Sequence, residues 1–294
     1  MSSSRQDSLS AVMIAGPDDR YLRDSLASLR PIADEIIFIN TGARPAAVET
    51  ARELGCLISD FPWGDDFSQA KNFGISKATG RWILSVDSDE VLQVDQGPPL
   101  LARALCAPAT PAYLLFQDNL YDAGVSKPNL VLRLFQNDPR LRFVNPVHEC
   151  ISPTLCEGWP GFFPPVLPVR LKHFGYLPEN VSGKHARNIR ILKKWVTTAP
   201  DCIFANFKLG NTLMEVGQKD EALHYLEKTY RLFARSSTRF SAPFLPAFAI
   251  VFHQALLEAG LNEQAERFDR TACGWIKVLF DRFPQLAPAG YSAK

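Results

Sequence analysis

Three carboxylate side chains stand within four residues, at Asp87, Asp89 and Glu90, directly after an apolar run. The run, residues 82–86, has the composition of a buried strand in a parallel sheet. Carboxylates crowded at a strand end repel one another and resist the loss of water, and a divalent cation relieves both problems. Mg²⁺ and Mn²⁺ prefer oxygen ligands and often join a carboxylate to substrate phosphates. The stretch therefore predicts a metal-assisted phosphate site at a strand end.

The competing interpretation is that Asp87 and Asp89 only cap a following turn or helix. Such capping is the commoner role of two aspartates separated by one residue when nothing else accompanies them. Here the preceding strand and the elements upstream favour the metal site.

The segments before this stretch alternate between strand and helix patterns. Strand patterns cover residues 9–15, 35–39 and 57–59, and helix patterns cover residues 22–29, 46–54 and 66–78. This alternation is typical of an α/β fold with a doubly wound, mostly parallel sheet of the Rossmann-like kind. The connections contain neither a G-x-G-x-x-G nor a G-x-x-x-x-G-K-[ST] pattern, which argues against a dinucleotide or P-loop site.

Proline and glycine become frequent between residues 93 and 178, where strand-like runs at 112–116, 130–135 and 166–173 lie between turns. This texture predicts an irregular, partly antiparallel half that carries a second substrate. A basic amphipathic helix is expected next, over residues 180–196; its cations are Lys184, Arg187, Arg190, Lys193 and Lys194.

The chain after Pro200 has helical patterns that resemble two tetratricopeptide units, with small residues at helix crossings and glycine at the turns. The matching residues are Leu209, Gly210, Gly217, Ala222 and Leu226, and then Gly260, Ala265 and Ala272. The 43 residues from Gly217 to Gly260 exceed the usual ~34, which predicts an insertion near residues 235–244. Two units are fewer than the ~3 of a freestanding array, so we expect packing on the first domain or on a partner, with a homodimer favoured.

The composition bounds the alternatives. A length of 294 residues suggests about two domains at roughly 150 residues each. A net charge of +1 gives no bulk attraction to nucleic acid or anionic membrane. No apolar run reaches the ~20 residues of a membrane span, and the polar start lacks a signal-peptide core. Six scattered cysteines predict reduced, mostly structural thiols in a cytoplasmic protein.

Ten short motifs occur in an order similar to that of family 2 glycosyltransferases. They are Ala33–Ile37, Thr41-Gly42, Asp60–Ser68, Ala70–Phe73, Ala78–Gly80, Asp87–Glu90, Arg133–Phe135, Val147–Glu149, His173–Tyr176 and Arg187-Asn188. The chain particularly resembles the bacterial branch with a C-terminal tetratricopeptide region, which includes the sublancin-type peptide glycosyltransferases. The resemblance implies a GT-A domain over residues 1–198, with a nucleotide-sugar half (1–95) and an acceptor half (96–198). A tetratricopeptide-like helical domain would follow over residues 199–294.

The resemblance also implies a role for each site residue. The donor-binding set would be Ala15, Asn40, Gly42, Lys71, Asn72, Asp87, Ser88, Arg133 and Arg187, with Lys71 facing the diphosphate. The metal set would be Asp87, Asp89 and His173. Asp89 would bind the ion directly, and Asp87 would either bind the ribose or support the metal site without contacting the ion. Glu149 would be the general base, with His148 positioning it or substituting for it.

Each of these assignments has a simpler alternative. His173 could be a hydrogen-bonded core histidine, Lys71 a solvated helix lysine, and Glu149 a turn-capping carboxylate. Two departures from the family pattern leave the donor open: Asn40 replaces the usual aspartate, and Gly16–Asp19 replaces an Asn-Glu pair. The amide oxygen of Asn40 could still accept the N3–H of uracil, so a UDP-sugar is favoured.

These features together predict a metal-dependent, inverting glycosyltransferase that uses Mg²⁺ or Mn²⁺. It would move a hexose from a UDP-sugar, such as UDP-glucose or UDP-N-acetylglucosamine, to a peptide, protein or glycan acceptor. One alternative is a nucleotidyl- or phosphotransferase with the same metal site. The other is a catalytically silent scaffold, which Asn40 and Pro17 favour and the intact set of Asp87, Asp89 and Glu149 opposes.

Overall fold

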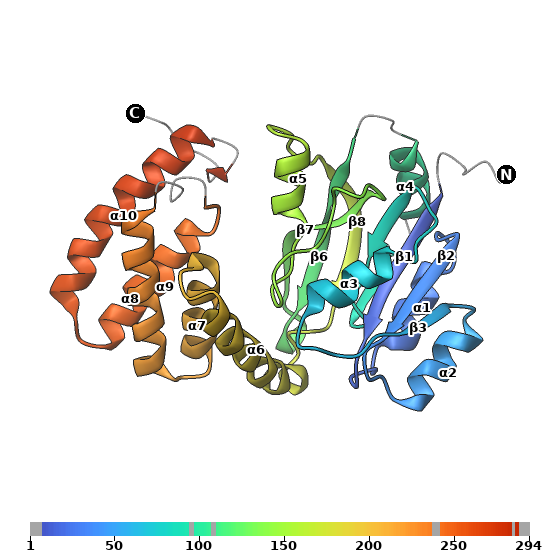
Figure 1. Cartoon of the computed structure of the whole chain (residues 1–294), viewed down its shortest axis with the longest axis horizontal. Coiled ribbons are helices and arrows are strands. Elements are labelled where there is room, and N and C mark those ends of the chain that lie inside the picture. Colours follow the sequence, from blue (N-terminus) through green and yellow to red (C-terminus); the bar gives the residue numbers. More distant parts are fainter. Residues whose placement is uncertain (1–7, 94–96, 107–109, 237–241, 284–285, 288–294) are drawn as a thin grey trace. The chain divides into compact units, whose positions relative to one another are not determined.

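The computed structural model describes residues 8–93, 97–106, 110–236, 242–283 and 286–287. The chain divides into two compact units, Met1–Lys184 and His185–Lys294 (Figure 1). Helix α6 (Pro178–Thr198) runs across the point of division. The predicted domain boundary after residue 198 therefore stays a prediction.

One eight-stranded sheet, in the order β3-β2-β1-β4-β7-β6-β8-β5, forms the centre of the first unit. Its strands are β1 (Leu9–Ala15), β2 (Glu35–Asn40), β3 (Leu57–Asp60), β4 (Trp82–Ser85), β5 (Glu90–Leu92), β6 (Ala112–Leu120), β7 (Ser126–Gln136) and β8 (Val166–His173). The first four strands are mutually parallel. Strand β7 then runs antiparallel to both β4 and β6, β8 runs parallel to β6, and β5 runs antiparallel to β8.

The α/β fold class is as the sequence predicts, with a parallel half followed by a mixed half. The mixed half arises because β6 and β7 are joined by a short turn, Asp122–Gly124. A short turn can join only antiparallel neighbours. The β6–β7 hairpin lies next to β4 in the sheet, and β8 and β5 follow it at the far edge.

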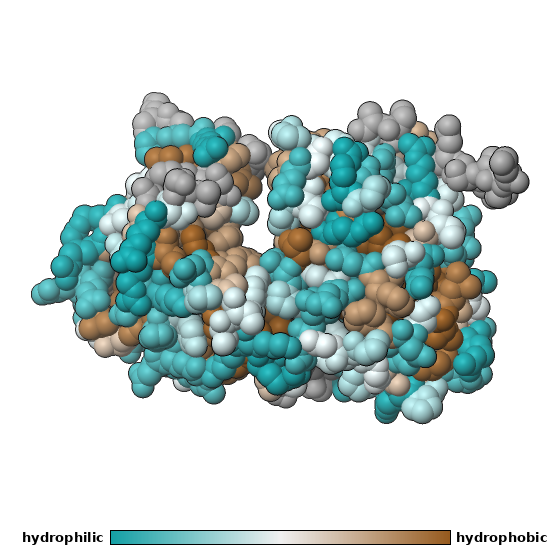
Figure 2. Space-filling model, in the orientation of Figure 1, coloured by the Kyte–Doolittle hydropathy of each residue, from teal (hydrophilic) through white to brown (hydrophobic). Residues whose placement is uncertain are grey.

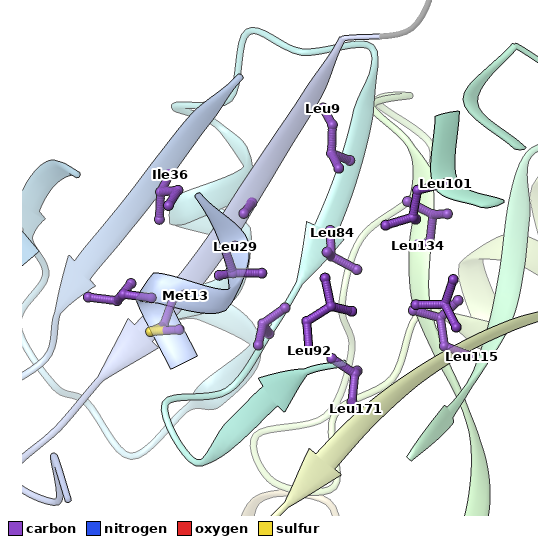
Figure 3. Close-up of a cluster of buried hydrophobic side chains, with 14 of the residues drawn as sticks. Leu9, Met13, Leu29, Ile36, Leu84, Leu92, Leu101, Leu115, Leu134 and Leu171 are labelled. Atoms are coloured by element: carbon purple, nitrogen blue, oxygen red, sulfur yellow. The ribbon is translucent and has the colours of Figure 1, made fainter. Parts of the chain in front are cut away.

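Helices cover both faces of the sheet. In β1 the side chains of Leu9, Ala11, Met13 and Ala15 face a core shared with α1 (Leu22–Leu29), α2 (Pro45–Glu53) and α4 (Gly97–Leu105), part of which Figure 3 shows. The intervening Val12 and Ile14 face a second core shared with α3 (Phe67–Ile75) and α5 (Ser152–Gly158). This alternation is the period-two pattern of a strand that is buried on both sides.

Helix α3 lies unusually close to the sheet. A Cβ on Gly74 would lie 2.5 Å from a methyl carbon of Val12, so only glycine permits this approach. The helix begins after Asp66, whose carboxylate accepts the backbone N–H of Gln69 at 2.9 Å, as an N-cap should. It ends at Ile75, three residues before the predicted end. Lys71, which belongs to this helix, contacts Asp87 just beyond β4.

The second unit contains α7 (Ile203–Glu215), α8 (Lys219–Arg235), α9 (Leu245–Glu258) and α10 (Asn262–Arg282). Gly217 and Gly260 end α7 and α9 with φ of 77° and 74°, a left-handed conformation that glycine adopts at little cost. Gly210 faces Leu226 where α7 crosses α8. Both predicted helix–turn–helix pairs are present, and much of the predicted insertion, residues 237–241, lies outside the described residues.

The surface carries hydrophobic patches among a mainly hydrophilic cover (Figure 2). Within the described ranges, no helix is both long and apolar enough to cross a membrane. All six cysteines are thiols, and Cys106, Cys156 and Cys273 are exposed. The prediction of reduced thiols is confirmed, whereas a structural role does not fit the three exposed ones, because an isolated cysteine carries no sequence signal of burial.

Candidate active site

Asp87 lies just beyond β4, between two basic side chains. Its Oδ1 is 2.8 Å from Lys71 Nζ, and its Oδ2 is 2.5 Å from the Arg133 guanidinium of β7. Burial raises the pKa of Asp87, but the charges of Arg133 and Lys71 outweigh it and hold that pKa well below its usual range. As a direct metal ligand, Asp87 would have to give up one of these contacts.

Lys71 connects Asp87 to the predicted base. Its ammonium is 2.7 Å from Glu149 Oε1 and 2.8 Å from Asp87 Oδ1, and the side chain is only 2% exposed. Lys71 is therefore not a solvated helix lysine. Burial lowers its pKa, but Asp87 and Glu149 raise it further, so the net pKa lies above the ordinary value. The predicted contact with a diphosphate would have to be made by a cation that already has two carboxylate partners.

Glu90 holds the turn that carries Asp87 and Asp89. It is fully buried and accepts the backbone N–H of Asp87 at 2.9 Å, the Arg133 guanidinium at 2.8 Å and the Gln117 amide. Ser25 of α1 donates to its backbone oxygen at 2.5 Å. Glu90 thus has a structural role in the turn that holds Asp87 and Asp89, which the sequence pattern alone does not distinguish from a ligand role.

Asp89 faces away from this network, toward β8 and the start of α6. Its Oδ2 is 2.5 Å from Lys184 Nζ and 3.6 Å from His173 Nε2. Burial raises the pKa of Asp89, while contacts with His173 and Lys184 outweigh it and lower the pKa to about 2. The sequence analysis assigned Lys184 only to a basic helix, because the spacing of charges on that helix does not reveal which one turns inward.

His173 is oriented by a second contact. Its Nδ1 lies 2.7 Å from the Asn119 amide oxygen of β6. An amide oxygen only accepts, so Nδ1 donates this hydrogen bond, and the ring is held with Nε2 facing Asp89. His173 is therefore more than a core histidine: the Asn119 contact orients its ring as second contacts orient metal-binding histidines.

The loop that carries His148 and Glu149 is fastened to α3. The amide of Asn72 both donates to and accepts from the backbone of Phe143, at 2.9 Å each. The backbone N–H of Phe67 donates to Pro146 O at 2.8 Å, and Ser68 donates to the backbone of Asn145. Asn72, predicted to bind the donor, thus uses its amide to hold the loop that carries the base.

Two non-glycine residues of this loop have left-handed backbones. Asn145 has φ of 78° and His148 has φ of 55°. A histidine in this region costs of order 1 kcal/mol, and such strain persists only where surrounding contacts enforce it. The conformation of His148 brings the next residue, Glu149, to Lys71. The two predicted catalytic residues are therefore positioned by one local bend.

The candidate nucleoside-binding residues lie at the ends of β1, β2 and β3. Asn40 Oδ1 accepts the backbone N–H groups of Gly42 at 3.1 Å and Ala43 at 2.8 Å, and its Nδ2 donates to Asp60 Oδ1 at 2.7 Å. The backbone oxygen of Ala15 accepts both the N–H and the hydroxyl of Thr41. The amide of Asn40 is thus engaged within the protein, and Asp60, which the sequence analysis did not select, presents a carboxylate beside it.

Two predicted donor residues remain. Ser88 lies in the turn between Asp87 and Asp89. Arg187 belongs to the second unit, where its guanidinium lies 3.3 Å from the Asn188 amide oxygen. Their roles at the donor site stay predictions.

A divalent ion would find a partial ligand set here. Across the described residues there is no group of three or more histidine, cysteine or acidic side chains arranged to hold a metal. Asp89 Oδ2 and His173 Nε2 are 3.6 Å apart, near the ~3 Å between neighbouring ligands of an octahedral ion with ~2.1 Å bonds. Mg²⁺ commonly takes few protein ligands and completes its shell with phosphates and water. The pair therefore fits an ion that arrives with a nucleotide.

Comparisons with known proteins show similarity to glycosyltransferases over part of the chain. Residues 10–139 match the family model described as Glycosyl transferase family 2. A TPR repeat-containing protein of Synechococcus elongatus is 29% identical over 277 residues, which cover 89% of this chain and 64% of that protein. The SPbeta prophage-derived glycosyltransferase SunS of Bacillus subtilis is 24% identical over 231 residues, which cover 72% of this chain and 50% of SunS. The chain thus spans between half and two thirds of the length of these relatives.

A structure of residues 1–349 of S. aureus TarS aligns with 97% of this chain and 94% of that one, at a TM-score of 0.44 and 11% identity. A Mycobacterium tuberculosis glucosyl-3-phosphoglycerate synthase, solved with Mn²⁺ and UDP, aligns with 40% of this chain and 45% of that one, at a TM-score of 0.30 and 17% identity.

Proposed function

Residues 10–139 form a family 2 glycosyltransferase domain, and on this premise we propose that the protein transfers a hexose from a nucleotide diphosphate sugar to an acceptor, with inversion at the anomeric carbon. The observation that carries the proposal is the chain of contacts Glu149–Lys71–Asp87, with distances of 2.7 and 2.8 Å. It holds a carboxylate that can take a proton at a fixed distance from the strand-end aspartates, where a diphosphate would bind.

The reaction assigns each group a task. The acceptor hydroxyl or thiol gives its proton to Glu149 as its oxygen or sulfur forms a bond to the anomeric carbon. The bond from that carbon to the phosphate oxygen breaks, and its electron pair leaves with the diphosphate. Cationic side chains near the strand ends stabilise the charge that develops on the leaving group. Lys71 holds Glu149 in place, and the bend at His148 orients it.

A divalent ion, Mg²⁺ or Mn²⁺, would supply further stabilisation of the leaving diphosphate. Asp89 and His173 would hold it, the first through a carboxylate oxygen and the second through Nε2. The contact of Asn119 with His173 Nδ1 would leave Nε2 available for this role. Asp87 would remain with its two basic partners, close to the ion but not bound to it.

The donor that we favour is a UDP-sugar, such as UDP-glucose or UDP-N-acetylglucosamine. A carboxylate, Asp60, lies beside Asn40 at the ends of β2 and β3, and a carboxylate can accept the N3–H of uracil. The acceptor would be a peptide or protein side chain or a glycan. The second unit, with its two helix pairs, would bind that acceptor or a second copy of the chain.

A screen of nucleotide sugars tests the proposal. The protein is incubated with UDP-, GDP-, CDP- and dTDP-sugars, with and without Mn²⁺, and the released nucleotide is identified by mass spectrometry. Metal-dependent release of a nucleoside diphosphate supports glycosyl transfer. Release of a nucleoside monophosphate with pyrophosphate would indicate a nucleotidyltransferase instead, and absence of both turnover and nucleotide binding would indicate a scaffold.

A further inference from the structure

Lys184 makes the closest contact to Asp89. Its Nζ lies 2.5 Å from Asp89 Oδ2, the same oxygen that is 3.6 Å from His173 Nε2. The Lys184 side chain is 28% exposed and that of Asp89 is 20% exposed, so the pair lies at the border between protein and solvent. An ammonium therefore contacts the same oxygen that a divalent ion would bind.

The surrounding backbone leaves room for this ammonium. Gly175 follows His173 by two residues, and a Cβ built on it would lie 2.5 Å from Lys184 Nζ and closer still to His173 Nε2. No other amino acid fits at position 175 without displacing one of the two nitrogens. The backbone N–H of Phe174 meanwhile donates to the backbone oxygen of Asp89 at 3.0 Å, which fixes the two segments together.

Lys184 also differs from the other cations around the strand ends. Lys71 and Arg133 each contact two carboxylates and have side chains that are 2% and 12% exposed. Within the described part of the chain, Lys184 contacts one carboxylate. A lysine has a flexible four-carbon stem and three donors that can rotate. Lys184 can therefore leave Asp89 at far lower cost than the buried cations could leave their partners.

On the basis of the proposed function, we infer that Lys184 is a donor-phosphate ligand that occupies the cation position of Asp89 until the metal and the nucleotide bind. A divalent ion bonded to Asp89 Oδ2 would repel an ammonium 2.5 Å from the same oxygen. The diphosphate that accompanies the ion offers new oxygens to the displaced Lys184. The ion and the ammonium would then share the charge of the leaving group.

This exchange has a measurable consequence. A metal ion that arrives alone must break the contact between Lys184 and Asp89 and gains no substitute for it. An ion that arrives with a nucleotide transfers Lys184 to the phosphates. Metal and nucleotide should therefore bind with positive coupling. Removal of the Lys184 charge should raise the affinity for the metal ion and lower the affinity for the nucleotide.

The test compares Lys184→Gln with Lys193→Gln. Lys193 lies on the same helix and pairs with Glu221 at 2.7 Å, so it provides a matched loss of one lysine. Mn²⁺ binding without nucleotide is measured by electron paramagnetic resonance, and UDP binding in saturating Mn²⁺ by calorimetry. We expect Lys184→Gln to bind Mn²⁺ about tenfold more tightly and UDP about tenfold more weakly, and Lys193→Gln to match the unchanged protein in both.

Unchanged Mn²⁺ and UDP affinities in Lys184→Gln, or weaker binding of both, would overturn the inference. If Lys184→Gln does not fold, Lys184→Arg is measured in the same way and should keep UDP affinity within about threefold, since it keeps the charge; a larger loss overturns the inference. A protein that binds no nucleotide at all contradicts the proposed function instead. The Mn²⁺ measurement, which needs no nucleotide, still reports in that case whether Lys184 competes for Asp89.

Discussion

The ammonium of Lys71 lies 2.7 Å from the carboxylate of Glu149, in a place where only 2% of the lysine side chain reaches solvent. The same ammonium contacts Asp87. A buried cation of this kind is expensive to leave unpaired, and so are its partners. The base and the strand-end aspartate are therefore coupled through one side chain.

Lys71→Met should be damaging, because it leaves Asp87 and Glu149 without their shared cation. We expect the free energy of unfolding to fall by about 3 kcal/mol. Glu149→Gln should lower kcat by roughly 10²- to 10⁴-fold with UDP binding intact. The double variant should be more stable than Lys71→Met alone, because one of the two uncompensated charges is gone. Urea unfolding and steady-state kinetics measure these effects.

Lys77 is exposed, so Lys77→Met serves as the control and should change neither the free energy of unfolding nor kcat. Equal stability of Lys71→Met and the unchanged protein would contradict the coupling. If His148→Ala proves more damaging to kcat than Glu149→Gln, the histidine is the base and Glu149 positions it.

Asp89→Asn should abolish turnover while the fold remains. The substitution keeps the shape of the side chain and removes one charge, so loss of the contacts with Lys184 and His173 should lower the stability without unfolding the protein. Activity is measured in saturating Mn²⁺, and thermal unfolding reports the fold. Retention of more than about a tenth of the activity, ~1.4 kcal/mol in the barrier, would show that Asp89 does not hold the ion.

Asn40 and Asp60 should act as a pair in nucleotide recognition. Since the Asn40 amide donates to Asp60 at 2.7 Å, Asn40→Asp places two carboxylates in contact and should weaken UDP binding. Asp60→Asn should lower UDP affinity about tenfold, because a charge-assisted hydrogen bond is lost. The exchange of both residues, Asn40→Asp with Asp60→Asn, should restore much of the affinity. Calorimetry with UDP, GDP, CDP and dTDP measures each variant.

An increase in UDP affinity from Asn40→Asp alone would instead assign base recognition to position 40. A preference of the unchanged protein for CDP would contradict acceptance of the uracil N3–H by Asp60, because cytosine has an acceptor at N3 and an amino donor at N4.

The two glycines Gly210 and Gly274 should respond oppositely to alanine. At Gly210 a Cβ would lie 2.7 Å from Leu226, so Gly210→Ala should destabilise the second unit by about 1–3 kcal/mol through overpacking. At Gly274, within α10, a Cβ would meet nothing within 4 Å, so Gly274→Ala should stabilise the helix by about 1 kcal/mol. Denaturant unfolding of the full chain gives both values; a Gly210→Ala protein as stable as the unchanged one would contradict the close crossing at Gly210.

A homodimer through the second unit should give a mass of twice the 32.8 kDa of one chain in light scattering at micromolar concentration. Ile250 and Leu257 are exposed on α9 and lie two turns apart, on one side of the helix. Ile250→Asp should therefore shift the mass toward one chain, and the exposed Glu263→Gln should not. A strictly monomeric mass of the unchanged protein would contradict the dimer.

Local patterns predicted the parallel half of the sheet closely. The strand pattern at residues 9–15 matches β1, and the turn glycines of both helix pairs are where the sequence indicates. What the sequence could not reveal depends on contacts between distant segments. The inward turn of Lys184, the use of Asn72 to hold Phe143 and the burial of Lys71 all depend on which loop lies opposite. The periodicity of a helix identifies a face but not what that face meets.

The buried position of Glu90 constrains how this turn can vary in evolution. Its carboxylate is satisfied by Arg133, by Gln117 and by the backbone of Asp87. Loss of any one of these partners leaves a charge or an amide buried without a hydrogen bond. Substitutions at positions 90, 117 and 133 should therefore be tolerated only in combination. In a saturation screen, substitutions at Glu90 should deplete the amount of protein in the cell, whereas those at Asp89 should leave its abundance intact and silence the enzyme.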